Sequence, residues 1–139
     1  MKSKVLLRIA AGLIFIHLLG HGVGHSGWDT PADPKMQEVV TVMKSHKSEF
    51  MGATQSMADY YNGYSLILFV VYSMSIFLLW FVSGFVREQP TIAGNILYTI
   101  GTAYLIFGVI EFVYFFPFAA AMSFFAGVLT LVAVAVARK

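Results

Sequence analysis

Apolar residues occur in four long runs along this chain, and polar residues gather in one segment between the first two runs. The runs cover residues 5–25, 64–85, 92–116 and 118–137. Each holds roughly 20 residues, the length that a helix needs to cross a hydrocarbon core about 30 Å thick. Continuous runs of this kind, without alternation of polar and apolar positions, predict an all-α bundle of four transmembrane helices.

The polar segment, residues 26–63, predicts a short amphipathic helix in the first outer loop. Asp33 is expected to cap its N-terminus, and Pro34 suits its first turn. An apolar face then recurs at steps of three and four residues, at Met36, Val39, Met43, His46 and Phe50. We expect this helix to lie on the outer membrane surface or to cap the bundle. His46 falls on its apolar face, which is unusual for a solvated histidine.

The distribution of cationic residues predicts that both termini are cytoplasmic. With the N-terminus inside, six of the nine Lys and Arg residues lie on the cytoplasmic side and three lie outside, where five acidic residues offset them. The positive-inside rule favours this orientation, in a multi-pass protein of a bacterial inner membrane. A cleaved signal peptide is the competing interpretation, because "MKSKVLLR" resembles a charged n-region. The first run lacks an A-x-A-like cleavage site and contains a histidine, so we expect it to be retained as a span.

The amino-acid composition excludes several kinds of functional site. A length of 139 residues allows a single domain, residues 1–139, and 58% of the residues are hydrophobic while 12% are charged. The net charge of +2 is too small and too evenly spread to indicate nucleic-acid binding. The absence of cysteine excludes disulfides, thiolate catalysis, iron–sulfur clusters and cysteine-type zinc sites. Any bound metal must therefore be held by nitrogen and oxygen.

Three of the four histidines share one stripe of the first span. In "IHLLGHGVGH", His17, His21 and His25 stand four residues apart, so they lie on one helix face with about 6 Å between neighbours. Two imidazoles at this spacing can bind one ion from a single helix. The third can carry protons or hydrogen-bond to a ligand.

Glu111 is the only acidic residue within a span, which makes it a functional candidate. An unpaired carboxylate at that position is costly, so it must be protonated, paired with a cation or bound to metal. Counting from the helix ends places Glu111 about 8 Å below the outer boundary, and His21 at about the same depth. The first and third spans are therefore expected to bring an imidazole and a carboxylate to one level.

These observations predict a metal or proton-handling site near the outer leaflet. The metal ligands that we expect are His21, His25 and Glu111, completed by His46 or Asp59. His17 and Glu111 are the expected catalytic, proton-handling groups. Zinc, iron, copper or manganese suits such ligands. Haem fits less well, because the other three spans contain no histidine to supply an opposite axial ligand.

Small residues predict where the spans pack. Gly94, Gly101 and Gly108 repeat every seven residues in the third span, and the fourth span carries Ser123, Gly127 and Thr130. Such residues let two helix backbones approach closely. Hydrogen bonds between helices are the structural alternative for Glu111 and the histidines.

The segments "LLGHGVGH" and "KSEFMGATQSMADYYNGYSL", with the four-span layout, resemble a family of small bacterial inner-membrane proteins of unknown function. The likeness covers most of the chain, and "DYYNGYSL" is its most distinctive part. It implies the four-span fold and no particular activity. More loosely, the layout is similar to that of small quinone-linked or oxygenase-type membrane oxidoreductases, a likeness of architecture alone.

Three functions stay open. The first is a membrane oxidoreductase or another metal-dependent enzyme that acts on a lipophilic substrate. The second is a non-catalytic accessory subunit of a larger membrane complex or homo-oligomer, in which the polar residues lock helices together. The third, a proton or metal-ion conduit, fits less well because no titratable residue continues the path toward the cytoplasmic side.

Overall fold

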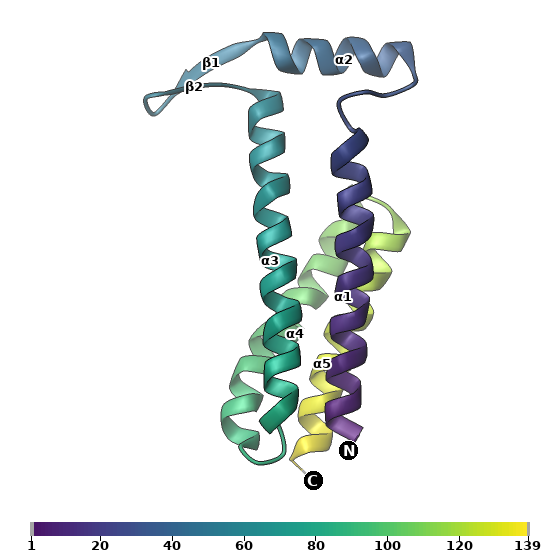
Figure 1. Ribbon diagram of the computed structural model, residues 1–139, viewed down its shortest axis with the longest axis vertical. Helices are drawn as coiled ribbons and strands as arrows, with labels where there is room; N and C mark the ends of the chain where they lie inside the picture. The colour runs from purple at the N-terminus through teal and green to yellow at the C-terminus, as the bar shows by residue number, and fades with distance from the viewer. Residues whose placement is uncertain (1, 139) are drawn as a thin grey trace. The chain divides into compact units, whose positions relative to one another are not determined.

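The structure, a computed structural model, describes residues 2–138 as five helices and one hairpin (Figure 1). In chain order these are α1 (Lys2–Gly27), α2 (Pro34–Ser45), β1 (Lys47–Phe50), β2 (Ala53–Ser56), α3 (Met57–Phe85), α4 (Pro90–Tyr114) and α5 (Pro117–Ala137). Within this part of the chain, α1, α3, α4 and α5 are long and apolar enough to cross a membrane. The expected all-helical chain with four such helices is thereby confirmed, as an integral membrane protein requires.

The chain divides into two compact units. Unit 1 contains the chain up to Gly20 and from Tyr72 onward, and unit 2 contains His21–Val71. Both α1 and α3 cross the boundary, so each contributes one part to each unit.

In unit 1, α4 and α5 pack closely along a stripe of glycines. They run antiparallel from the short connection at Phe115 and Phe116 (Figure 1). A Cβ on Gly127 would lie 2.8 Å from the backbone oxygen of Gly101, and one on Gly108 would lie 2.9 Å from Cβ of Phe124. Only glycine permits backbones this close. The predicted packing role of these residues is confirmed.

The remaining core of unit 1 draws on all four of its helices. Fully buried apolar side chains include Leu7, Ile14, Leu79, Leu97 and Val134. The outward faces are also apolar, with Phe77 and Phe112 each 74% exposed. A surface of this kind is stable against lipid chains rather than water.

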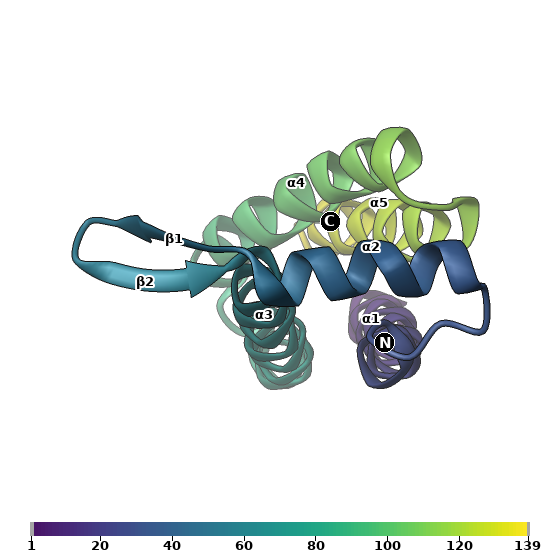
Figure 2. The same ribbon diagram turned by 90° about the horizontal axis from the view of Figure 1, so that it is seen from above.

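In unit 2, α2 leads from the end of α1 to the hairpin that precedes α3 (Figure 2). The Asp33 side chain accepts a hydrogen bond from the Lys35 backbone N–H, and Pro34 occupies the first turn. The helix ends at Ser45, because His46 adopts an extended conformation while its N–H bonds to Val42.

The segment after α2 is a hairpin, whereas the apolar periodicity had suggested helix as far as Phe50. β1 and β2 pair antiparallel, with Phe50 opposite Ala53. Met51 and Gly52 form the turn and both have positive φ, 51° and 83°. Two residues with positive φ characterise the turns whose twist suits a two-residue hairpin loop.

Candidate functional site

Each of the four helices in unit 1 contributes one polar side chain to a single buried group. The group consists of His17 from α1, Tyr72 from α3, Glu111 from α4 and Ser123 from α5, and we call it the inner polar cluster. None of the four residues is more than 7% exposed. Buried polar groups in an apolar bundle persist when they are hydrogen-bonded to one another.

The inner polar cluster is a chain of contacts with Tyr72 at its centre. The Tyr72 hydroxyl donates a hydrogen bond to Glu111 Oε1 over 3.2 Å and lies 3.4 Å from His17 Nε2. His17 Nε2 is itself 3.6 Å from Glu111 Oε1, and His17 Nδ1 is 3.2 Å from Ser123 Oγ. The imidazole therefore meets a hydroxyl at each ring nitrogen, with the carboxyl group beyond one of them.

These contacts constrain the direction of several hydrogen bonds. While the single hydroxyl proton of Tyr72 is used on Glu111, Tyr72 can only accept from His17, and His17 then carries a proton on Nε2. Ser123 donates to Nδ1 when the imidazole is neutral and accepts from it when the imidazole is protonated. The same geometry accommodates a neutral imidazole with a carboxylic acid, or an imidazolium with a carboxylate.

One oxygen of the cluster is left over. Glu111 Oε2 is buried and, within residues 2–138, has no partner in good hydrogen-bond geometry, although the Ser123 hydroxyl also interacts with this carboxyl group. The Tyr104 hydroxyl, on the same face of α4 two turns earlier, is likewise buried without a partner in good geometry, and Ser75 of α3 interacts with it. Unpartnered buried oxygens are uncommon, and they mark a position where a proton, a water molecule or a substrate group can bind.

Unit 2 holds a second group, the serine–histidine cluster of His21, His25 and Ser65. His21 Nε2 lies 3.0 Å from Ser65 Oγ and 3.1 Å from the Ser65 carbonyl oxygen. His25 Nδ1 lies 2.8 Å from the same Oγ. Phe69 packs edge-on against both imidazoles, with ring centroids 4.8 and 5.4 Å away. The four-residue spacing of the histidines thus directs one nitrogen of each ring toward one hydroxyl.

The carbonyl oxygen in this cluster sets the tautomers. Because it can only accept, His21 donates from Nε2. Ser65 Oγ can then accept from His21 and donate to Nδ1 of a neutral His25. A metal ion at these two nitrogens has to replace the hydrogen bonds to Ser65.

The other two expected ligands have local structural roles. Asp59 Oδ2 accepts hydrogen bonds from the backbone N–H and the hydroxyl of Ser56, at 2.9 and 2.8 Å, and Ser56 Oγ accepts from the Asp59 N–H. This reciprocal arrangement is a capping box at the start of α3. His46 is exposed at the end of α2, and neither residue is hydrogen-bonded to the serine–histidine cluster. In the described part of the chain, no three His, Asp or Glu side chains converge as metal ligands.

A partly exposed polar group completes unit 2 near α2. Trp28 Nε1 donates to Asn62 Oδ1 over 3.0 Å, and Lys44 Nζ lies 3.0 Å from Asp29 Oδ2. The hydrogen bond from Lys44 lowers the pKa of the Asp29 carboxyl below its ordinary value. These contacts attach the segment after α1 to α2 and to the beginning of α3.

The structure therefore groups the sequence candidates in two sets. It places Glu111 beside His17, and it places His21 beside His25. Two hydroxyls that complete these sets, those of Tyr72 and Ser65, were not singled out from the sequence, and Ser123 was interpreted only as a packing residue. The sequence contains one signal for the role of Tyr72: it is a tyrosine in the middle of the apolar stretch "FVVYSMS", and a buried hydroxyl needs a hydrogen-bond partner.

Comparisons of the chain with family models, with curated proteins and with solved structures found no match.

Proposed function

We propose that this integral membrane protein binds and releases a proton at the inner polar cluster, with Glu111 and His17 as the exchanging groups. In this proposal both termini are cytoplasmic and the cluster lies toward the outer leaflet of a bacterial inner membrane. More specifically, we propose that the protein is a membrane oxidoreductase that acts on a lipophilic substrate, since such reactions take up or release protons.

The observation that carries the proposal is the partnering of the Glu111 carboxyl group. Oε1 receives the Tyr72 hydroxyl and has His17 within 3.6 Å, whereas Oε2 has no partner in good hydrogen-bond geometry in residues 2–138. A carboxyl group that only locked helices together would be expected to use both oxygens. An oxygen held in place but left without such a bond is suited to receive a proton.

Infrared difference spectroscopy of the membrane-reconstituted protein tests this proposal. Between acid and alkaline pH, the wild-type protein is expected to show a carboxylic-acid C=O band that is exchanged for carboxylate bands. Glu111→Gln keeps an oxygen that can accept from Tyr72 but cannot titrate, so this band is expected to disappear. Glu88→Gln, which removes a carboxylate from the turn after α3, serves as the matched control. An unchanged difference spectrum in Glu111→Gln would contradict the proposal.

The accessory-subunit alternative predicts a different set of results. If the cluster only fastens helices, no titrating band is assigned to Glu111, and Glu111→Gln preserves the fold because the bond from Tyr72 is retained. Purification of the wild-type chain alone, stable and without a partner, argues against this alternative.

We also propose a metal site at the serine–histidine cluster, because His21 Nε2 and His25 Nδ1 both lie within 3.0 Å of one oxygen. Two imidazoles meeting at one point suit zinc, iron or copper, and the remaining positions would be filled by water, a substrate or a further side chain. His46 stays a predicted additional ligand.

Elemental analysis and an optical spectrum of the detergent-purified protein test the metal proposal. We expect about one metal ion per chain, lost in both His21→Ala and His25→Ala. His17→Ala is the matched control, since His17 belongs to the inner polar cluster and is expected to leave metal content unchanged. Metal content that does not change in His21→Ala rejects the site.

A further inference from the structure

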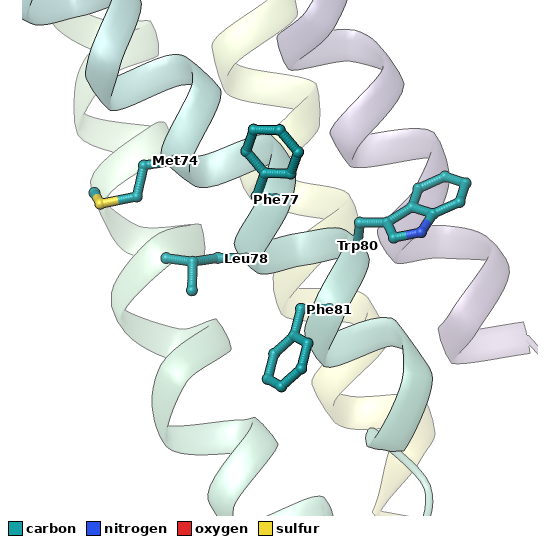
Figure 3. Close-up of a pocket in the computed structure, with 5 residues that line it drawn as sticks. All are labelled: Met74, Phe77, Leu78, Trp80 and Phe81. Carbon is teal, nitrogen blue, oxygen red and sulfur yellow. The ribbon is translucent and has the colours of Figure 1, made fainter.

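A shallow, open apolar surface on α3 in unit 1, which we call the groove, has a cation at one side. It is lined by side chains of α3, namely Met74, Phe77, Leu78, Trp80 and Phe81 (Figure 3). Four of these five are more than half exposed, from Met74 at 53% to Phe77 at 74%. In a spanning helix, side chains this exposed are in contact with lipid chains or with another protein.

Trp80 joins this groove to α1. Its indole extends from α3 toward α1 (Figure 3). The Arg8 guanidinium lies over the ring, 4.4 Å from the ring centroid. Stacking of this kind uses one face of the guanidinium and leaves its edge N–H groups free for an anion. No ion pair or hydrogen bond of the Arg8 side chain occurs within residues 2–138.

Lys4 adds a second positive charge on the same side of α1. It stands four residues before Arg8, so the two share a helix face, and both are exposed. Glu88 is the single acidic residue of unit 1 near this end of the helices within the described chain, and it pairs with neither cation. Within residues 2–138, no acidic side chain therefore pairs with the exposed positive charge beside the groove.

The position of this pair along the helices corresponds to the membrane–water interface. Arg8 is six residues from the start of α1, about 9 Å, and Trp80 is five residues from the end of α3, about 8 Å. A helix of 26 residues exceeds the hydrocarbon thickness by about 9 Å in total. An arginine at this depth reaches the headgroup level with its long side chain, and tryptophan favours the same level.

We propose that this groove binds an anionic phospholipid, with one acyl chain against Phe77, Trp80 and Phe81 and the phosphate on Arg8. The apolar floor fits the acyl chain, and the stacked guanidinium with Lys4 nearby fits the phosphate diester. A second copy of the chain is a weaker candidate occupant, because it would have to supply an anion for Arg8 as well as apolar side chains.

Fluorescence quenching by brominated lipids tests the lipid site in the full chain. Trp28→Phe leaves Trp80 as the sole tryptophan, since the chain has two. In phosphatidylcholine vesicles doped with a brominated lipid, we expect brominated phosphatidylglycerol to quench Trp80 at about five-fold lower content than brominated phosphatidylcholine. This preference is expected to disappear in Arg8→Gln and to persist in Arg8→Lys, which retains the charge. Arg87→Gln, which removes a cation from the turn after α3, is expected to keep it.

A second measurement needs no substitution at Arg8. Raising the salt concentration screens the headgroup charge and is expected to narrow the difference between the two lipids. Equal quenching by both lipids at low salt overturns the proposal, and so does the absence of quenching by either, since a partner protein would then cover the groove. Neither readout depends on proton exchange at Glu111 or on metal at His21.

Discussion

At the scale of single residues, Tyr72 connects the inner polar cluster. Its hydroxyl is the donor to Glu111 and the acceptor for His17, and both contacts are buried. Tyr72→Phe removes the hydroxyl and leaves both buried partners without it. We expect a loss of about 1–3 kcal/mol in the free energy of unfolding. Denaturation of the detergent-solubilised protein, followed by circular dichroism, measures this loss.

Tyr114→Phe is the matched control for that substitution. Tyr114 is 77% exposed and its hydroxyl has no hydrogen bond in the described residues, so its removal is expected to leave stability unchanged. Equal stability of the Tyr72→Phe and wild-type proteins would show that the hydroxyl does not hold the cluster together.

The sequence identified the ionisable members of the clusters but not how they are grouped. A carboxylate and three histidines within apolar runs are conspicuous, because each is costly to bury. Counting residues from the run ends placed His21 level with Glu111, yet the histidine beside Glu111 in unit 1 is His17, one turn earlier. One turn of helix is about 5.4 Å, which is within the error of a depth counted from the ends of an apolar run. A count of this kind also says nothing about how the helix is rotated about its axis, and the rotation decides which side chains meet.

At the scale of elements, the α4–α5 contact depends on Gly127. Gly127→Ala would place its Cβ 2.8 Å from the Gly101 backbone oxygen, and a backbone cannot yield as a flexible side chain does. We expect the two helices to separate, at a cost of about 1–3 kcal/mol in stability. Gly84→Ala is the control: a Cβ on Gly84 meets nothing within 4 Å, and alanine favours helix over glycine. Thermal unfolding in detergent distinguishes the two variants, and equal melting temperatures would refute the close contact.

The spanning helices were predictable from the sequence and the hairpin was not. In a membrane, a long apolar run is stable only as a helix or as a strand of a closed barrel. A run of about 20 residues has the length of a spanning helix and is longer than a barrel strand, so its length predicts a helix. The segment from His46 to Ser56 is short, and its apolar residues fit steps of three and four as well as they fit a strand. Its turn is Met51–Gly52 rather than a common pair such as Asn-Gly, so the hairpin signal was weak.

At the scale of the whole molecule, the direction of the chain across the membrane is predicted from charge and not from packing. Six of nine cations fall on the side that we assign to the cytoplasm, together with both termini. The proposed proton exchange at Glu111 from the outer side depends on this orientation. The spanning of α3 can be tested directly, because α3 is the single long helix between Ser45 and Arg87.

The absence of cysteine makes that test simple, since each introduced thiol is unique. Ser45 and Arg87 are both exposed, so Ser45→Cys and Arg87→Cys are expected to disturb the fold little. If α3 spans the membrane and the termini are cytoplasmic, a membrane-impermeant maleimide added to intact spheroplasts labels Ser45→Cys and does not label Arg87→Cys. Permeabilised cells are expected to show labelling of both. The reverse pattern inverts the orientation, and labelling of both thiols in intact spheroplasts means that α3 does not cross the membrane. In either case the outer-leaflet position of the inner polar cluster has to be abandoned.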